Sequence, residues 1–159
     1  MELNKESIYK LSNIEDIKKF IVGGKAIITL ESKKTGRWFT YKIQRNKNEK
    51  NNPTSPLFVS VLTGSDNESS YTYMGTIFCN DDKLDFKLTK NSKISEKALS
   101  YLAFNYFFVN LMKNVKHVDL DVYHRGICCR CGRAITVPES LITGFGPECY
   151  KINHSDLIK

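Results

Sequence analysis

The sequence lacks a long apolar segment: none of its runs approaches the roughly 18 apolar residues that a membrane-spanning helix requires. The segment Met1 to Lys10 also lacks the apolar core of a secretory signal peptide. Both absences argue against membrane and secreted proteins. We therefore expect a protein of the cytoplasm, where cysteines stay reduced.

Motifs of zinc enzymes are also missing. The sequence contains neither His-Glu-x-x-His nor the combination of His-x-Glu with Pro-Cys-x-x-Cys that marks zinc deaminases. It has no internal repeats and no regular alternation of strand and helix patterns. We expect a protein that is not an enzyme.

The chain has an excess of positive charge, which is unevenly distributed along the sequence. The chain of 159 residues has a net charge of +7, and residues 1–118 contain 19 Lys and Arg against 12 Asp and Glu. Residues 119–159 contain 5 of each kind, so the cationic surface belongs to the N-terminal part. A basic surface suits an anionic partner. The alternative is a solvated lysine-rich surface in a chain rich in Lys, Asn and Ile.

Four of the 5 cysteines lie within residues 128–149. Cys128 and Cys131 have the Cys-x2-Cys spacing that puts two thiolates on one tight turn, and Gly132 follows where such a turn often needs a left-handed residue. Cys149 offers a third thiolate. In a reducing compartment this pattern favours a structural Zn²⁺ site over a disulfide.

The fourth ligand has several candidates. His124 precedes Cys128 with 3 residues between them, and His154 follows Cys149 with 4 between them; both spacings suit a metal ligand. Cys129 adjoins Cys128, and neighbouring side chains usually point apart, so both rarely bind one ion. We prefer His124 and keep His154 as the alternative. Four protein ligands would close the site, as in structural rather than catalytic zinc.

Alternating apolar residues predict an α+β fold with an antiparallel sheet and two helices, followed by a small zinc-knuckle module. Ser12 and Glu15 have capping-box spacing before a short helix that ends at Gly23 and Gly24. A longer helix is expected from Glu96 to about Lys113. We place a domain boundary between residues 1–116 and 117–159. The expected strands are 25–31, 37–45, 58–63, 71–78, one around 84–88, and 118–123. The apolar stripe expected on the longer helix comprises Ala98, Leu99, Leu102, Ala103, Tyr106 and Val109.

The first hairpin is the best candidate for a binding surface. Its second strand alternates, so that Phe39 and Tyr41 share one face while Trp38 and Lys42 share the other. An exposed aromatic ring among lysines can stack on a nucleic-acid base while the lysines hold phosphates. The competing interpretation is that a helix covers Trp38. The candidate binding residues are Lys33, Lys34, Arg37, Trp38, Lys42 and Arg45.

Several blocks of the sequence resemble phage and prophage proteins of unknown function. The most specific are Arg130-Cys131-Gly132-Arg133, Thr136-Val137-Pro138-Glu139-Ser140 and Gly144-Phe145-Gly146-Pro147-Glu148-Cys149; similar upstream blocks occur at 35–42, 58–64 and 71–78. The resemblance implies a mobile-element protein of the host bacterial cytosol. It also implies a zinc site formed by His124, Cys128, Cys131 and Cys149. Cys129 departs from the pattern, because these proteins more often have another residue there.

Two functions remain open for an accessory protein of this kind. The first is binding of nucleic acid through the basic hairpin. The second is inhibition of a host defence protein, such as a CRISPR effector or a restriction enzyme, by direct contact. Both fit a small basic protein that acts by macromolecular binding.

Overall fold

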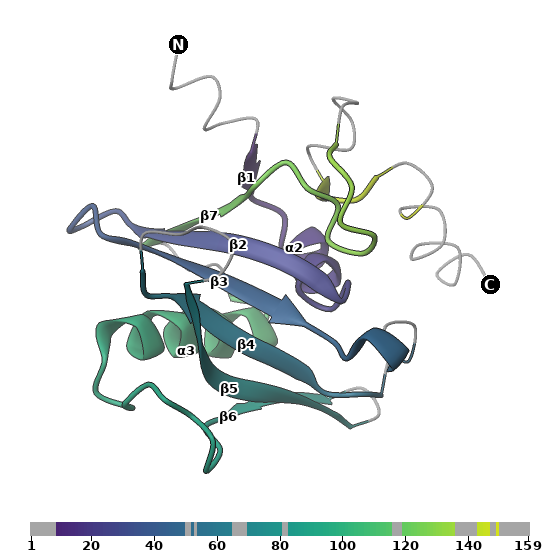
Figure 1. The fold of residues 1–159 in the computed structure, drawn as a ribbon. Helices are drawn as coiled ribbons and strands as arrows, with labels where there is room; N and C mark the ends of the chain where they lie inside the picture. Colours follow the sequence, from purple (N-terminus) through teal and green to yellow (C-terminus); the bar gives the residue numbers. More distant parts are fainter. Residues whose placement is uncertain are drawn as a thin grey trace.

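A computed structural model describes residues 9–49, 52, 54–64, 70–80, 83–115, 119–135, 143–146 and 149. Its described strands form one curled, fully antiparallel sheet in the order β1-β7-β2-β3-β4-β5-β6 (Figure 1). Together with its two helices this confirms the predicted α+β class. The strands are β1 (Lys10–Leu11), β2 (Lys25–Ser32), β3 (Trp38–Gln44), β4 (Leu57–Leu62), β5 (Tyr71–Asn80), β6 (Lys83–Lys87) and β7 (Leu120–His124). The helices are α2 (Ile14–Ile21), α3 (Leu99–Met112) and the short 3-10 helix η1 (Lys47–Glu49).

The two faces of the sheet differ in what covers them. Because side chains alternate along a strand, the registered pair Ile28 and Tyr41 points to the same face, and both are fully buried. Both helices pack on this covered face, behind the sheet as Figure 1 is drawn. The opposite face, which we call the open face, has no helix over it among the described residues. The position of the helices therefore decides which side chains are available to a partner.

Helix α2 starts one residue later than the capping box predicted. The side chain of Asn13, and not that of Ser12, accepts hydrogen bonds from the amides of Glu15 and Asp16 at 2.9 and 3.2 Å. Its apolar face, including the fully buried Phe20, packs on the sheet. Gly24, with φ of 103°, provides the left-handed turn after the helix.

Helix α3 turns a different face to the sheet from the one expected. The predicted stripe is largely exposed, with Leu99 at 53% and Leu102 at 48%. The side chains buried instead are Phe104, Phe107, Phe108 and Leu111, together with Ser100. The reason is that this helix is apolar on nearly every side, so its periodicity does not select a face, and the larger phenyl rings fill the core. The predicted start was also too early: Ser95 forms a local turn with Lys97, and the helix begins at Leu99.

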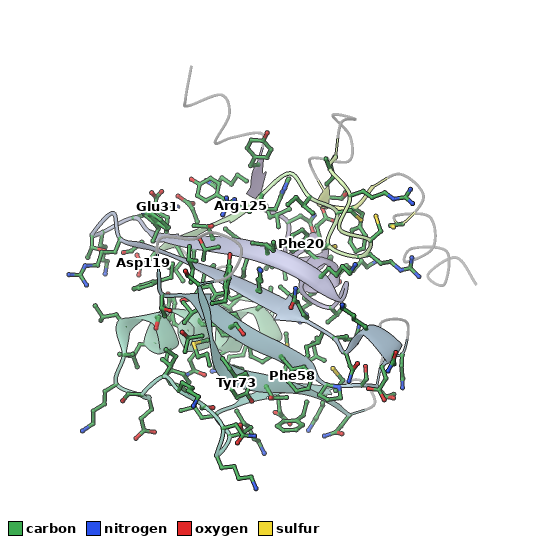
Figure 2. The ribbon with its side chains drawn as sticks, viewed as in Figure 1. Phe20, Glu31, Phe58, Tyr73, Asp119 and Arg125 are labelled. Carbon is green, nitrogen blue, oxygen red and sulfur yellow. The ribbon has the colours of Figure 1, made fainter. Side chains whose placement is uncertain are left out.

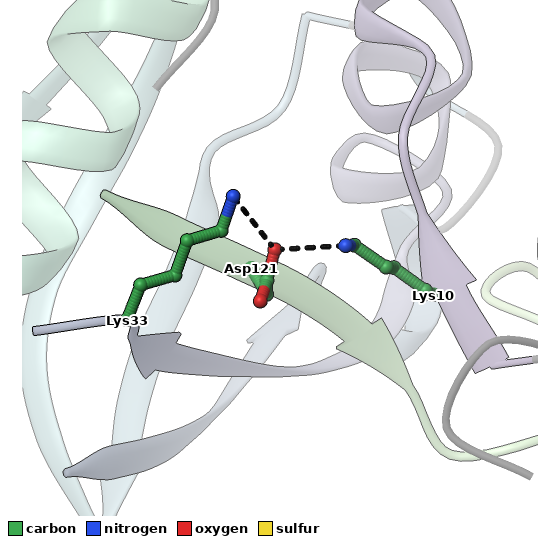
Figure 3. Close-up of polar contacts among 3 residues, drawn as sticks. All are labelled: Lys10, Lys33 and Asp121. Carbon is green, nitrogen blue, oxygen red and sulfur yellow. Dashed lines mark ion pairs between the residues drawn. The ribbon is translucent and has the colours of Figure 1, made fainter. Parts of the chain in front are cut away.

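Strand β7 lies inside the main sheet, between β1 and β2. Its residues pair with both neighbours, for example Val122 with Leu11 and with Leu30. Asp121 of β7 also accepts ion pairs from Lys10 at 3.0 Å and from Lys33 at 3.6 Å (Figure 3). Residues 120–124, which the predicted division assigns to the metal module, thus form a strand of the sheet, and the division itself stays a prediction. None of the helices in the described part of the chain is both long and apolar enough to cross a bilayer.

Candidate metal centre and open sheet face

Three thiols converge directly after β7. The sulfur atoms of Cys128, Cys131 and Cys149 all lie within 4.8 Å of one another. The turn that carries the first two is held by hydrogen bonds from the Cys128 amide to the Arg133 carbonyl at 2.8 Å and from the Gly132 amide to the Cys128 carbonyl at 3.0 Å. Gly132 has a φ of 79°, the left-handed geometry expected after the second sulfur. This donor set fits a soft-to-borderline divalent cation such as Zn²⁺.

The thiols of the cluster differ in acidity. Burial acts to raise the pKa of Cys128, but hydrogen bonds from the backbone amides of Cys131, Gly146 and Arg130 outweigh it, and the pKa is lowered. Burial raises the pKa of Cys149 to about 11, with a further upward contribution from its contact with Cys131. Cys128 therefore loses its proton more readily than Cys149, whose raised pKa favours the neutral thiol.

Cys129 points away from this cluster, as its position next to Cys128 predicted. It is fully buried, and its sulfur lies 2.7 Å from the place where a Cβ on Gly23 would be. Burial also raises the pKa of the Cys129 thiol well above its usual value. Its backbone is held on both sides, because its carbonyl accepts from the Lys25 amide at 2.7 Å and its amide donates to the Gly144 carbonyl at 3.0 Å. Cys129 thus fastens the turn that carries the thiol cluster to the start of β2.

The structure does not bring His124 into the group of converging ligands. His124 is buried at the end of β7, beside the rings of Tyr9 and Phe20 at 5.5 and 6.0 Å. Its Nδ1 accepts a hydrogen bond from the Gly126 amide at 2.9 Å, which places the proton of a neutral imidazole on Nε2. A metal bound at either nitrogen would require loss of this hydrogen bond. His124 as fourth ligand is untested, and its hydrogen bond with Gly126 favours the alternative, His154, which lies outside the described residues.

The glycine-rich segment before Cys149 has a packing role. Gly144 has a φ of 78°, and a Cβ at this position would collide with the ring of Phe20 on α2. The next residue, Phe145, is fully buried. The segment therefore seats the cluster against α2.

The six candidate binding residues lie in different environments. Lys34 pairs with Asp119 at 3.7 Å, and Lys33 pairs with Asp121 as described above. Arg45 is turned away from solvent: its guanidinium donates to the Val22 carbonyl at 2.6 Å. Arg37 lines a groove next to α3 on the covered side. Trp38 and Lys42 lie on the open face, and Lys33 reaches Asp121, which is registered with Glu31 on that same face.

The open face carries more aromatic rings than the hairpin alone predicted. Trp38 is 59% exposed, and Phe58 and Phe78 are 41% and 38% exposed. The Nζ of Lys42 lies 4.2 Å from the centre of the Tyr71 ring, a cation–π contact. Figure 2 shows Phe58 and Tyr73 over β4 and β5, further along the sheet from Glu31 and Arg125. Strict alternation would place Tyr71 and Phe78 on opposite faces of β5, and only the register shift opposite Val59 and Ser60 brings both to the open face, so the sequence pattern could not have identified this set of rings.

Comparison with known proteins reaches only the C-terminal part. Residues 118–154 match the model of DUF6011, a family of unknown function. This segment contains β7, the three converging cysteines and both candidate histidines. No curated protein and no solved structure matches the chain. Residues 118–154 are therefore similar to a family of unknown function.

Proposed function

We propose that this protein is a non-catalytic, zinc-binding protein that binds single-stranded nucleic acid on the open face of its sheet. One observation supports nucleic-acid binding: Trp38 stands exposed on a sheet face that none of the described helices covers, on the same face as Lys42 and Tyr71. Every base has a π-face, so exposed rings bind single strands with little sequence preference.

The metal has a structural role in this proposal. Cys128, Cys131 and Cys149 would hold Zn²⁺, and a fourth ligand from the chain would complete the tetrahedron. Zinc would then lock the turn after β7 to the segment that contacts α2 through Gly144 and Phe20. The ion thereby fixes the end of the strand on which part of the open face is built.

The open face offers both kinds of contact that a single strand requires. Trp38, Phe58 and Phe78 supply stacking surfaces from β3, β4 and β5. Lys42 supplies a cation above Tyr71, where it can meet a phosphate while its stem covers the ring. Many proteins that bind single-stranded RNA or DNA use a sheet whose exposed aromatic side chains stack on the bases.

Trp38 is the only tryptophan of the chain, so its own fluorescence reports binding directly. Titration with single-stranded oligonucleotides should quench this emission, and fluorescence anisotropy of labelled strands should give the affinity. Trp38→Ala should weaken binding by about 1–3 kcal/mol, the usual contribution of one stacked base to the binding free energy. Tyr106→Ala is the matched control, because Tyr106 is an exposed ring on α3, on the other side of the sheet. Wild-type protein that binds no strand at low salt would refute the proposal.

A second candidate function, direct contact with a partner protein, is favoured by the groove beside α3. The exposed side chains Leu99, Leu102 and Tyr106 border this groove, whose volume is 610 Å³. Contiguous apolar surface of this kind commonly contacts proteins. A partner such as a host defence protein would use this surface, and Leu102→Ser would weaken its binding while leaving the affinity for oligonucleotides unchanged.

A further inference from the structure

A pocket opens on the sheet next to Trp38. It has a volume of 370 Å³, within the range of about 300–1,000 Å³ that is typical of small-molecule sites. Three aromatic residues line it: Trp38 from β3, Tyr123 from β7, and Tyr9 from the segment before β1. Rings from three separate segments therefore surround one space large enough for a planar group.

Two opposite charges line this pocket as well, and Thr29 and His124 complete it. Glu31 of β2 is registered directly opposite Trp38, so its side chain leaves the sheet on the same face as the indole. Arg125 follows β7 and lines the pocket as well (Figure 2). Within the part of the chain that the structure describes, neither side chain forms an ion pair or a side-chain hydrogen bond, with the other or with a third residue.

This combination of charges restricts the chemistry of the ligand. A phosphate would meet the carboxylate of Glu31, and a simple cation would meet the guanidinium of Arg125. A neutral planar group satisfies both charges if one edge donates hydrogen bonds and another accepts them. The aromatic lining adds stacking surface for that plane.

Guanine meets these requirements among the four bases. Its N1–H and N2–H₂ groups form adjacent donors for a carboxylate, and its O6 and N7 atoms form the acceptor pair that arginine commonly binds. Adenine and cytosine each present a single amino group beside a ring-nitrogen acceptor, so neither offers a carboxylate two adjacent donor groups, and thymine presents two carbonyls that a carboxylate repels. We propose that this pocket takes one guanine base of a bound single strand, with Glu31 on the Watson–Crick edge and Arg125 on O6 and N7. The proposal rests on the nucleic-acid function proposed above and adds a base preference to it.

The test compares short oligothymidylates that contain one central guanine, adenine, inosine or 7-deazaguanine, measured by fluorescence anisotropy at one salt concentration. Guanine should bind at least about 5-fold tighter than adenine, the low end of what a bidentate side-chain–base pair supplies. Inosine lacks the N2 amino group and should lose affinity through Glu31. 7-Deazaguanine lacks N7 and should lose affinity through Arg125.

Two variants assign these losses to their residues. In Glu31→Gln the preference for guanine over adenine and over inosine should collapse, although removal of a negative charge should leave binding to oligothymidylate unchanged or stronger. In Arg125→Lys the penalty for 7-deazaguanine should vanish. Glu96→Gln is the charge-matched control, because Glu96 is exposed just before α3 and should leave every preference intact.

The outcomes separate the two proposals. Equal affinity for all four strands in the wild-type protein would overturn the guanine pocket and leave stacking on the open face in place. A guanine preference that survives in Glu31→Gln would also overturn it. Absence of any binding would overturn both proposals.

Discussion

The sulfur of Cys129 lies 2.7 Å from the point where a Cβ on Gly23 would stand, and the Cys129 carbonyl oxygen lies 2.6 Å from it. The turn after α2 and the turn after β7 thus meet at a glycine that leaves no room for a side chain. This contact joins the turn that carries Cys128 and Cys131 to the turn before β2, at a point distant in sequence. It explains why Cys129, although adjacent to Cys128 of the thiol cluster, is buried in the core.

Gly23→Ala should test this contact. The added methyl group would force the Cys129 backbone to move, and overpacking of this kind costs about 1–3 kcal/mol in the free energy of unfolding. Denaturation by urea, monitored by circular dichroism, would measure it. The double variant Gly23→Ala/Cys129→Ala should recover only part of the loss, because the carbonyl oxygen remains in place. Unchanged stability in Gly23→Ala would show that the two turns do not touch.

The cysteines should separate into ligands and non-ligands. Purified protein should hold about one Zn²⁺ per chain, and Cys128→Ser, Cys131→Ser and Cys149→Ser should each reduce this content strongly. Cys129→Ser should keep the metal, since its sulfur faces Gly23 and not the cluster. Elemental analysis of freshly prepared protein measures the content. Loss of zinc in Cys129→Ser, with retention in Cys128→Ser, would reverse the assignment.

Zinc binding should release protons at neutral pH. Burial raises the pKa of Cys149 to about 11, so this thiol is protonated near pH 7.5 and must lose its proton to bind the metal. Zinc affinity should therefore rise with pH through the neutral range. Isothermal titration calorimetry in buffers of different ionisation enthalpy gives the number of protons released. A value of zero would mean that Cys149 is not a ligand.

Local patterns predicted much of this structure, and contacts between distant segments explain what they missed. Period-2 alternation located the strands, and the Cys-x2-Cys spacing located two of the converging thiols. The buried face of α3 could not be predicted, because Phe104 and Leu102 are equally apolar and only the shape of the core selects between them. The insertion of β7 between β1 and β2 has no local signal in the sequence. It depends on pairing of residues 120–124 with residues 10–11 and 28–32, which lie far away in the chain. The role of Gly144 likewise appears only when α2 is placed against it.

The two candidate histidines should respond differently to replacement. His124 is buried and its Nδ1 already accepts from Gly126, so His124→Ala should lower stability but leave the zinc content near one per chain. His154→Ala should speed the loss of zinc to a chelator, because its spacing from Cys149 suits the remaining ligand position. A colorimetric chelator competition measures both rates. Faster zinc loss in His124→Ala than in His154→Ala would return the role of fourth ligand to His124.

The cations of the hairpin should contribute unequally to binding of a single strand. Lys42 lies on the open face above Tyr71, whereas Lys33 is paired with Asp121. Lys42→Ala should therefore reduce the slope of log affinity against log salt by about 0.7, the value of one phosphate contact on a single strand. Lys33→Ala should change the slope less, because its charge is already partly balanced by a carboxylate. Lys97→Ala, at an exposed lysine just before α3, is the control for loss of one positive charge away from the open face. Equal slopes for the Lys42 and Lys97 variants, measured by anisotropy across a salt series, would show that the bound strand does not cross the open face at Lys42.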